Sequence, residues 1–158
     1  MRGQSKYKKK IIKPDVKFGS TAVAKFINYL MEGGKKSTAQ KILYTSLDEA
    51  SGVLKKEPLD VFNRVISQVS PNVEVRSKRI GGANYQIPVD VKEPRRTALA
   101  MRWIIDAAKS KKGKPMSSRL AEVYKESIEG TGAAIKKRSD VQKMAEANKA
   151  FAHFARSR

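Results

Sequence analysis

The sequence contains no cysteine and a single histidine, His153, among its 158 residues. Without cysteine the chain can form neither a disulfide nor a thiolate metal site. One histidine cannot by itself build a zinc site, which needs several protein ligands. We therefore expect no metal and no other cofactor, and a fold that a hydrophobic core stabilises unaided.

Long apolar runs are also missing. Uncharged stretches such as 67–73 and 97–101 are far shorter than the roughly 20 apolar residues that cross a bilayer. No apolar segment of secretory length follows the basic residues 1–13. We expect a soluble, cytoplasmic protein, and the sequence leaves an organellar location open.

Acidic residues are scarce beside basic ones. The chain has 15 Asp and Glu against 34 Lys and Arg, a formal net charge of +19. This excess is larger than solubility requires and indicates a polyanionic partner, with nucleic acid the first candidate. Several acids gather at Asp48, Glu49, Glu57 and Asp60, a region that we expect to face away from the nucleic acid, toward solvent or a basic protein.

The charge pattern divides the chain in two. Residues 1–17 carry many cations, one acid and too few hydrophobic residues to fold alone. They predict a disordered basic N-terminal arm that orders on a polyanion, or alternatively a solubilising tail. Residues 18–158 predict a single, mainly α domain.

Apolar residues at three- and four-residue spacing predict about six helices in this domain. The first begins at Ser20, and the second opens with a capping-box pattern of Ser37 and Gln40 and buries Val53 near its end. Pro58 and Pro94 suit the first turns of the third and fourth helices. A fifth follows the basic loop 109–114, and the sixth runs from about residue 133 with an inner face that reaches 151–152.

Between the third and fourth helices, residues 72–91 predict a protruding basic β-hairpin, because two alternating segments flank Gly81-Gly82. If Val75 and Val89 pair on one face of the hairpin, the residue numbers of each cross-strand pair sum to 164. This register leaves a bulged loop of three or five residues around Gly82. Pro88 lacks a donor and must face a free edge.

Basic residues cluster at four places in this sequence. These are Lys35-Lys36, residues 76–79 of the hairpin, a stripe of Arg95, Arg102 and Lys109 at seven-residue spacing, and Lys136 to Arg138. We expect these clusters to contact RNA. Scattered cations beside acids, namely Lys55, Lys56 and Lys125, are more typical of solvated surface.

We find no active site in the sequence and expect no enzyme. Gly34-Lys35-Lys36-Ser37 is similar to a phosphate-binding loop, but Tyr29 occupies the position of its first glycine. His153 has no partner nucleophile. Trp103 is expected in the core or at its edge, whereas Tyr85 fits equally well a packed position and a base-stacking platform.

Several long strings resemble the family of small-subunit ribosomal protein number seven, of the bacterial or organellar type. They are Gly34-Lys35-Lys36, VEVRSKRIGGANYQIP in the hairpin, residues 98–103, and GAAIKKRSDVQKMAEANKAFAHF at 132–154. The resemblance implies a six-helix domain with a protruding hairpin and a structural, non-catalytic role in the ribosome. It further implies a primary rRNA-binding protein that binds the 3′ major domain and nucleates assembly of the subunit head.

The resemblance also implies partners and site residues. Expected partners are small-subunit rRNA, exit-site tRNA and mRNA near the intersubunit face, and neighbouring ribosomal proteins of the head and platform. The residues that it places on rRNA are Lys8, Lys9, Lys10, Lys35, Lys36, Arg76, Lys78, Arg79, Arg95, Arg102, Lys109, Lys136, Lys137 and Arg138. Those that it places near tRNA and mRNA are Arg79, Gly81, Gly82, Asn84 and Tyr85.

The alternative interpretation of the residues themselves is an architectural DNA-binding protein, in which the hairpin enters a minor groove. Such an arm usually carries an apolar wedge at its tip, and Gly81-Gly82 offers none. A membrane-surface protein would need a helix face left open to lipid, but the core uses the apolar faces here. The spread of cations along the chain favours contact with several RNA segments.

Overall fold

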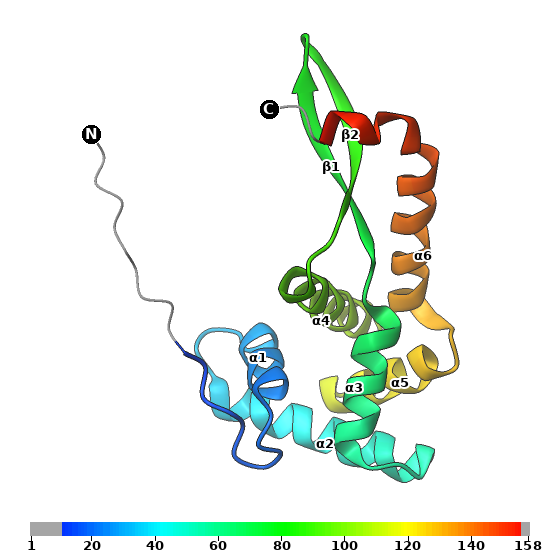
Figure 1. The fold of residues 1–158 in the computed structure, drawn as a ribbon. Helices are drawn as coiled ribbons and strands as arrows, with labels where there is room; N and C mark the ends of the chain where they lie inside the picture. Colours follow the sequence, from blue (N-terminus) through cyan, green and yellow to red (C-terminus); the bar gives the residue numbers. More distant parts are fainter. Residues whose placement is uncertain (1–10, 156–158) are drawn as a thin grey trace, which may run out of the picture.

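The computed structural model describes residues 11–155, in which a helical body carries a two-stranded hairpin that projects away from it (Figure 1). The prediction of a mainly α domain with a protruding hairpin is confirmed. Lys8, Lys9, Lys10 and most of the predicted N-terminal arm lie outside the described residues. The end of that arm is tied to the body, because the buried carboxylate of Asp15 accepts a 2.7 Å hydrogen bond from the hydroxyl of Tyr44.

Six α-helices and one 3₁₀ helix form within residues 11–155. Their bounds are α1 Thr21–Leu30, α2 Lys36–Leu54, α3 Pro58–Val69, α4 Glu93–Ser110, α5 Met116–Ile128, α6 Gly132–Ala147 and the 3₁₀ helix η1 Lys149–Ala155. Ser20 caps α1, with its hydroxyl accepting from the backbone N–H of Val23, and Pro58 is the first residue of α3. Both starts are as predicted.

Two helices, α2 and α6, differ from the prediction at their ends. The capping box at Ser37 does not form, because α2 begins at Lys36 and the cap position falls two residues earlier than predicted, at Lys35, which makes no side-chain hydrogen bond. Val53, predicted to be buried, is 65% exposed at the end of α2. The sixth helix ends at Ala147 rather than continuing past Phe151, and the chain then turns into η1.

The hydrophobic core lies among the six α-helices. Its largest fully buried side chains include Tyr124, Phe26 and Phe62, and the rings of the two phenylalanines meet edge-on with centroids 5.6 Å apart. Trp103 packs partly buried against this core, as predicted. Burial of this continuous apolar surface is the main stabilising term for the helical body.

The hairpin pairs β1 (Val73–Ile80) with β2 (Ala83–Asp90), and the predicted register is wrong. Val75 lies opposite Pro88 and Arg76 opposite Ile87, so partner numbers sum to 163. The turn is the two residues Gly81 and Gly82, whose φ angles of 57° and 90° suit a type I′ turn. Pro88 then falls in a non-hydrogen-bonded pair, where its missing N–H costs nothing.

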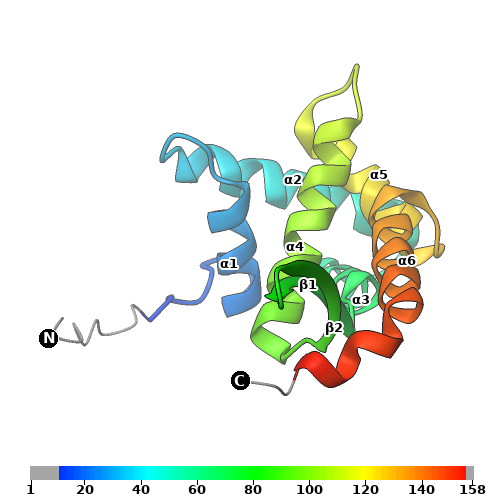
Figure 2. The ribbon, with the colours of Figure 1, turned by 90° about the horizontal axis from the view of Figure 1, so that it is seen from above.

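Figures 1 and 2 show how the elements surround the base of the hairpin. α4 lies between α1 and α6, while α6 runs beside the hairpin and contacts β1. η1 crosses back onto β2 and contacts it extensively. α2 lies at the end of the body opposite the hairpin (Figure 1), where Asp48 pairs with Lys17 at 2.9 Å. At least part of the acidic region is therefore far from the hairpin tip.

Candidate nucleic-acid interface

Five of the cations that the sequence predicts on rRNA are exposed and have no ion-pair or ring partner among the described residues, and these five occupy three separate places. They are Lys35 and Lys36 at the start of α2, Arg79 near the hairpin tip, and Lys136 and Lys137 in the first half of α6. The sequence predicted all five. Their charges are available to a polyanion because no carboxylate in the described part of the chain neutralises them.

A second group of predicted cations is held by a buried acid. The side chain of Glu74 is 10% exposed and receives Arg76 on one oxygen and Arg95 on the other, with the Nε atoms of these arginines at 2.6 and 3.2 Å. Arg76 belongs to the hairpin and Arg95 to α4. The triad therefore fastens the base of the hairpin to the helical body, and it leaves both arginine side chains about half exposed, at 61% and 46%.

The triad sets the ionisation of Glu74. Burial by itself raises the pKa of this carboxyl, but the hydrogen bonds and positive charges of Arg76 and Arg95 outweigh burial and leave the pKa below its ordinary value of 4.5. Glu74 is accordingly charged at neutral pH. Its one negative charge balances only part of the charge of the two arginines, so the hairpin base stays basic.

Three more of the predicted cations each contact a different kind of group, namely an aromatic ring, an exposed acid or a backbone carbonyl. The guanidinium of Arg102 lies 5.4 Å from the centre of the Tyr29 ring, and Lys109 pairs with Glu32. Lys78 donates a 3.1 Å hydrogen bond to the carbonyl of Phe154 in η1. The stripe of Arg95, Arg102 and Lys109 thus lies exposed along α4, as predicted, with each member oriented by a neighbour.

Arg138 differs from the other predicted cations. It is only partly exposed, and its Nη1 donates to the backbone carbonyl of Gln68 at the end of α3. This contact turns its head toward α3 and away from Lys136 and Lys137. The cluster that the sequence predicts at 136–138 is therefore split by the fold.

The hairpin tip and its flank have different characters. Gly81, Gly82 and Asn84 are exposed, as a contacting tip requires. Tyr85 is half-buried, with its ring centroid 5.3 Å from that of Phe151 and 5.5 Å from that of Phe154. Of the two roles left open for Tyr85, the structure shows packing against η1.

Two features of this site escaped the sequence analysis, namely the acid Glu74 and the aromatic contacts of η1. Glu74 is flanked in sequence by Val73 and Val75 and showed no sign of being buried. The signal for η1 was the density of aromatic residues at Phe151 and Phe154. Within residues 11–155, no group of three His, Asp or Glu side chains could hold a metal ion, and no helix is long and apolar enough to cross a membrane.

A helical body, a basic hairpin fastened at its base, and unpaired cations in three places are typical of nucleic-acid-binding proteins, and this is the class that the fold and the surface define. Comparison with known proteins gives the family. The model of the ribosomal protein S7p/S5e family matches residues 1–149.

Individual relatives match this chain in sequence over most of their length. The chain is 54% identical over 145 residues to the small ribosomal subunit protein uS7 of Fervidobacterium nodosum, covering 92% of this chain and 94% of that protein. It is 52% identical to the uS7 protein of Thermotoga maritima over 146 residues, with the same coverage. It is also 52% identical to that of Polynucleobacter necessarius over 154 residues, or 98% and 99% of the two chains.

The chain belongs to the ribosomal protein S7p/S5e family. Membership makes it a structural constituent of the ribosome, which confirms the resemblance that the sequence strings indicated.

Proposed function

We propose that this chain is a primary rRNA-binding protein of the small ribosomal subunit, which binds the 3′ major domain, nucleates assembly of the head and acts in the cytoplasm. The observation that carries the proposal is the set of exposed, unpaired cations at the start of α2, at the hairpin tip and on α6. Cations in three places suit an RNA junction, where several helices approach one protein. The names of the uS7 relatives support the subunit assignment.

The mechanism is electrostatic and structural. RNA helices that meet at a junction repel one another, and ammonium and guanidinium groups placed between them replace repulsion by ion pairing. A-form RNA offers side chains mainly phosphates, 2′-hydroxyls and shape, so recognition depends on the folded form of the RNA more than on base sequence. The protein thereby favours the folded junction over open forms.

Within this proposal the hairpin tip, with Arg79, Gly81, Gly82 and Asn84, approaches exit-site tRNA and mRNA. The exposed position of the tip, far from the helical body in Figure 1, supports this role. Tyr85 lies near the tip but contributes by packing. Arg138 is left out of the RNA surface because its head is turned onto the Gln68 carbonyl.

The test compares two triple variants that lose the same charge. Lys35→Gln, Arg79→Gln and Lys136→Gln together remove one unpaired cation from each place, while Lys55→Gln, Lys56→Gln and Lys125→Gln remove three cations that the sequence assigns to solvated surface. Binding is measured across a salt series, to an rRNA fragment of the 3′ major domain and to a DNA duplex of equal length.

We expect the first variant to lose about two to three units of the salt-dependence slope on the rRNA fragment, since each lost phosphate contact removes roughly 0.7–0.9. The control variant should keep the slope nearly unchanged. An equal loss of slope in both variants would show that the RNA attracts the chain only through its net charge. Equal affinity of the unaltered chain for RNA and DNA would instead favour the architectural DNA-binding alternative.

A further inference from the structure

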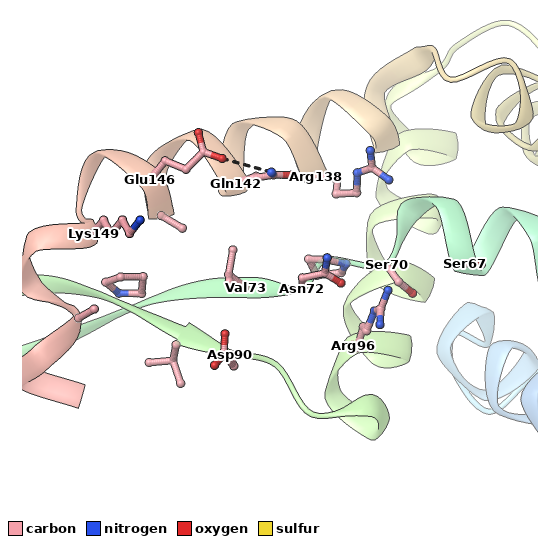
Figure 3. A pocket seen from close by; sticks show the side chains of 15 residues that line it. Ser67, Ser70, Asn72, Val73, Asp90, Arg96, Arg138, Gln142, Glu146 and Lys149 are labelled. Atoms are coloured by element: carbon pink, nitrogen blue, oxygen red, sulfur yellow. Dashed lines mark hydrogen bonds between the residues drawn. The ribbon is translucent and has the colours of Figure 1, made fainter. Parts of the chain in front are cut away.

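A groove of about 740 Å³ runs between α6 and the base of the hairpin, beside the end of α3 (Figure 3). This volume is in the range of sites that take a small ligand or a few residues of peptide, roughly 300–1,000 Å³. Its lining is partly apolar, with Val73, Pro88, Val89 and Ala145 among its residues. The RNA surface proposed above uses none of the groove's residues.

One end of the groove holds two arginines with little compensation. Figure 3 shows Arg138 coming from α6 and Arg96 from α4, on opposite walls near Ser70. Arg138 donates to the neutral carbonyl of Gln68, and the Nη1 of Arg96 lies 3.7 Å from an oxygen of Glu93, whose side chain is 75% exposed. The Nε of each arginine is buried and has no hydrogen-bond partner among the described residues.

The guanidinium groups of Arg96 and Arg138 are both positively charged. Their partners among the described residues are only an exposed acid and a neutral carbonyl, so the two groups repel each other. A carboxylate placed between them would accept charge-assisted hydrogen bonds from both, and these are among the strongest in proteins. The amide of Asn72, which also lines this end, could donate a further hydrogen bond. The end near α3 is therefore suited to a single carboxylate.

The other end of the groove has the opposite character. Its lining includes Asp90 of the hairpin, Glu146 of α6 and Lys149, which lie farther from the two arginines, so two acids outnumber one cation here (Figure 3). Gln142 donates a 3.2 Å hydrogen bond to Glu146 and holds it beside the groove. A strand of nucleic acid carries a charge at every phosphate and would meet repulsion from these two carboxylates.

We propose that this groove binds an extended segment of a neighbouring protein, with an Asp or Glu side chain of that segment between Arg96 and Arg138. The apolar part of the lining takes small aliphatic side chains, and Asp90 with Glu146 accepts backbone N–H groups or a basic side chain. The site thus adds a protein partner to the proposed contacts with RNA. It depends on the groove alone and does not require the proposed rRNA site.

The experiment follows the Nε–H resonances of Arg96 and Arg138 by NMR while the full chain is titrated with three probes. The first is the blocked peptide acetyl-Lys-Val-Ser-Val-Glu-amide, and the second is its match with Gln in place of Glu. The third is hexauridylate, a single-stranded RNA. Arg96→Gln and Arg138→Gln are compared with Lys143→Gln, which removes an exposed cation of α6 outside the groove lining. Circular dichroism establishes that each variant is folded.

We expect the Glu peptide to shift both arginine resonances and to bind at least tenfold more tightly than the Gln peptide. Arg96→Gln and Arg138→Gln should each weaken the Glu peptide at least fivefold, and Lys143→Gln should not. If Arg138→Gln fails to fold because the Gln68 contact is lost, Arg96→Gln decides alone.

Equal binding of the two peptides, or no shift with either, would overturn the proposal. Shifts produced by hexauridylate but not by the Glu peptide would make the groove an RNA site and would overturn it too. Binding of the rRNA fragment, measured on the same variants, distinguishes this failure from failure of the proposed function.

Discussion

Replacing Glu74 by Gln tests whether the hairpin is fastened to the body by charge. Gln keeps the shape of the side chain but removes the charge that Arg76 and Arg95 share. Since the arginines lower the pKa of the Glu74 carboxyl in spite of its burial, the charged form is favoured in the folded protein. The substitution must therefore destabilise the fold at neutral pH.

The contacts set the size of the effect. Hydrogen bonds to charged groups contribute roughly 1.5–3 kcal/mol and neutral ones about 0.5–1.5. The oxygen of Gln can keep a neutral bond to one arginine, but its NH2 group cannot accept from the other, so the substitution removes roughly 2.5–4.5 kcal/mol before screening. Both arginine side chains are about half exposed, at 61% and 46%, and solvent screens part of this difference. We expect a loss of about 1–2 kcal/mol, or roughly 2–8 °C in Tm for a chain of this size.

The assay is urea unfolding of the full chain at several pH values. A folded-state pKa below 4.5 means that the stabilisation from Glu74 is complete above that value and is lost as the pH falls through the folded-state pKa. The difference between the unaltered chain and Glu74→Gln should thus be full at pH 7 and vanish in acid. Glu93→Gln, whose acid is 75% exposed, is the control and should change stability by less than about 0.5 kcal/mol. A Glu74→Gln effect that is absent at pH 7, or unchanged in acid, would refute this account.

Two further substitutions test the fold. Gly132→Ala should destabilise it by about 1–3 kcal/mol in urea unfolding, because Gly132 has a φ of +85° and an added Cβ would lie 2.6 Å from an oxygen of Glu126. The control Gly52→Ala, in α2 with open space around it, should instead stabilise by about 0.5–1 kcal/mol, and the prediction fails if the two behave alike. Phe151→Ala removes a ring that packs on Tyr85, so we expect faster protease cleavage within η1 with little change in the Tm of the helical body. Cleavage at the unaltered rate would show that this ring does not hold η1 on the hairpin.

Periodicity predicted the first five helices well because each buries an apolar face, whereas α6 buries only Ala134 and Ala145 and its end was predicted wrongly. The register of the hairpin failed because the same reasoning assumed that its apolar residues would share a face. The fold instead puts Glu74 and Arg76 on the face of the buried Ile87, where Arg95 compensates the acid. The Gly81-Gly82 pair was the better signal, since two glycines in succession favour a two-residue turn with positive φ at both positions.

The basic clusters were predictable as sequence, but their division into paired and unpaired cations was not. Arg95 meets Glu74 across 21 positions and Arg138 meets Gln68 across 70, and no local pattern encodes contacts at such separations. The same holds for Lys78, whose partner carbonyl lies 76 positions away in η1. Which cations remain available to a polyanion is thus a property of the tertiary structure.

The two attachments of the hairpin bear directly on how it could bind RNA. A two-stranded hairpin alone is marginally stable in water, and a loose arm would lose conformational entropy on binding. Here Glu74 holds the base of the hairpin to α4, and η1 packs through Tyr85 farther along β2. Arg79 is thereby carried on a strand whose direction is already set, so the RNA contact proposed for it would cost less ordering than the contact of a flexible arm. An arm held in this way can fix the spacing between Arg79 and the cations of α2 and α6, which a junction-binding protein needs if it is to select one RNA fold.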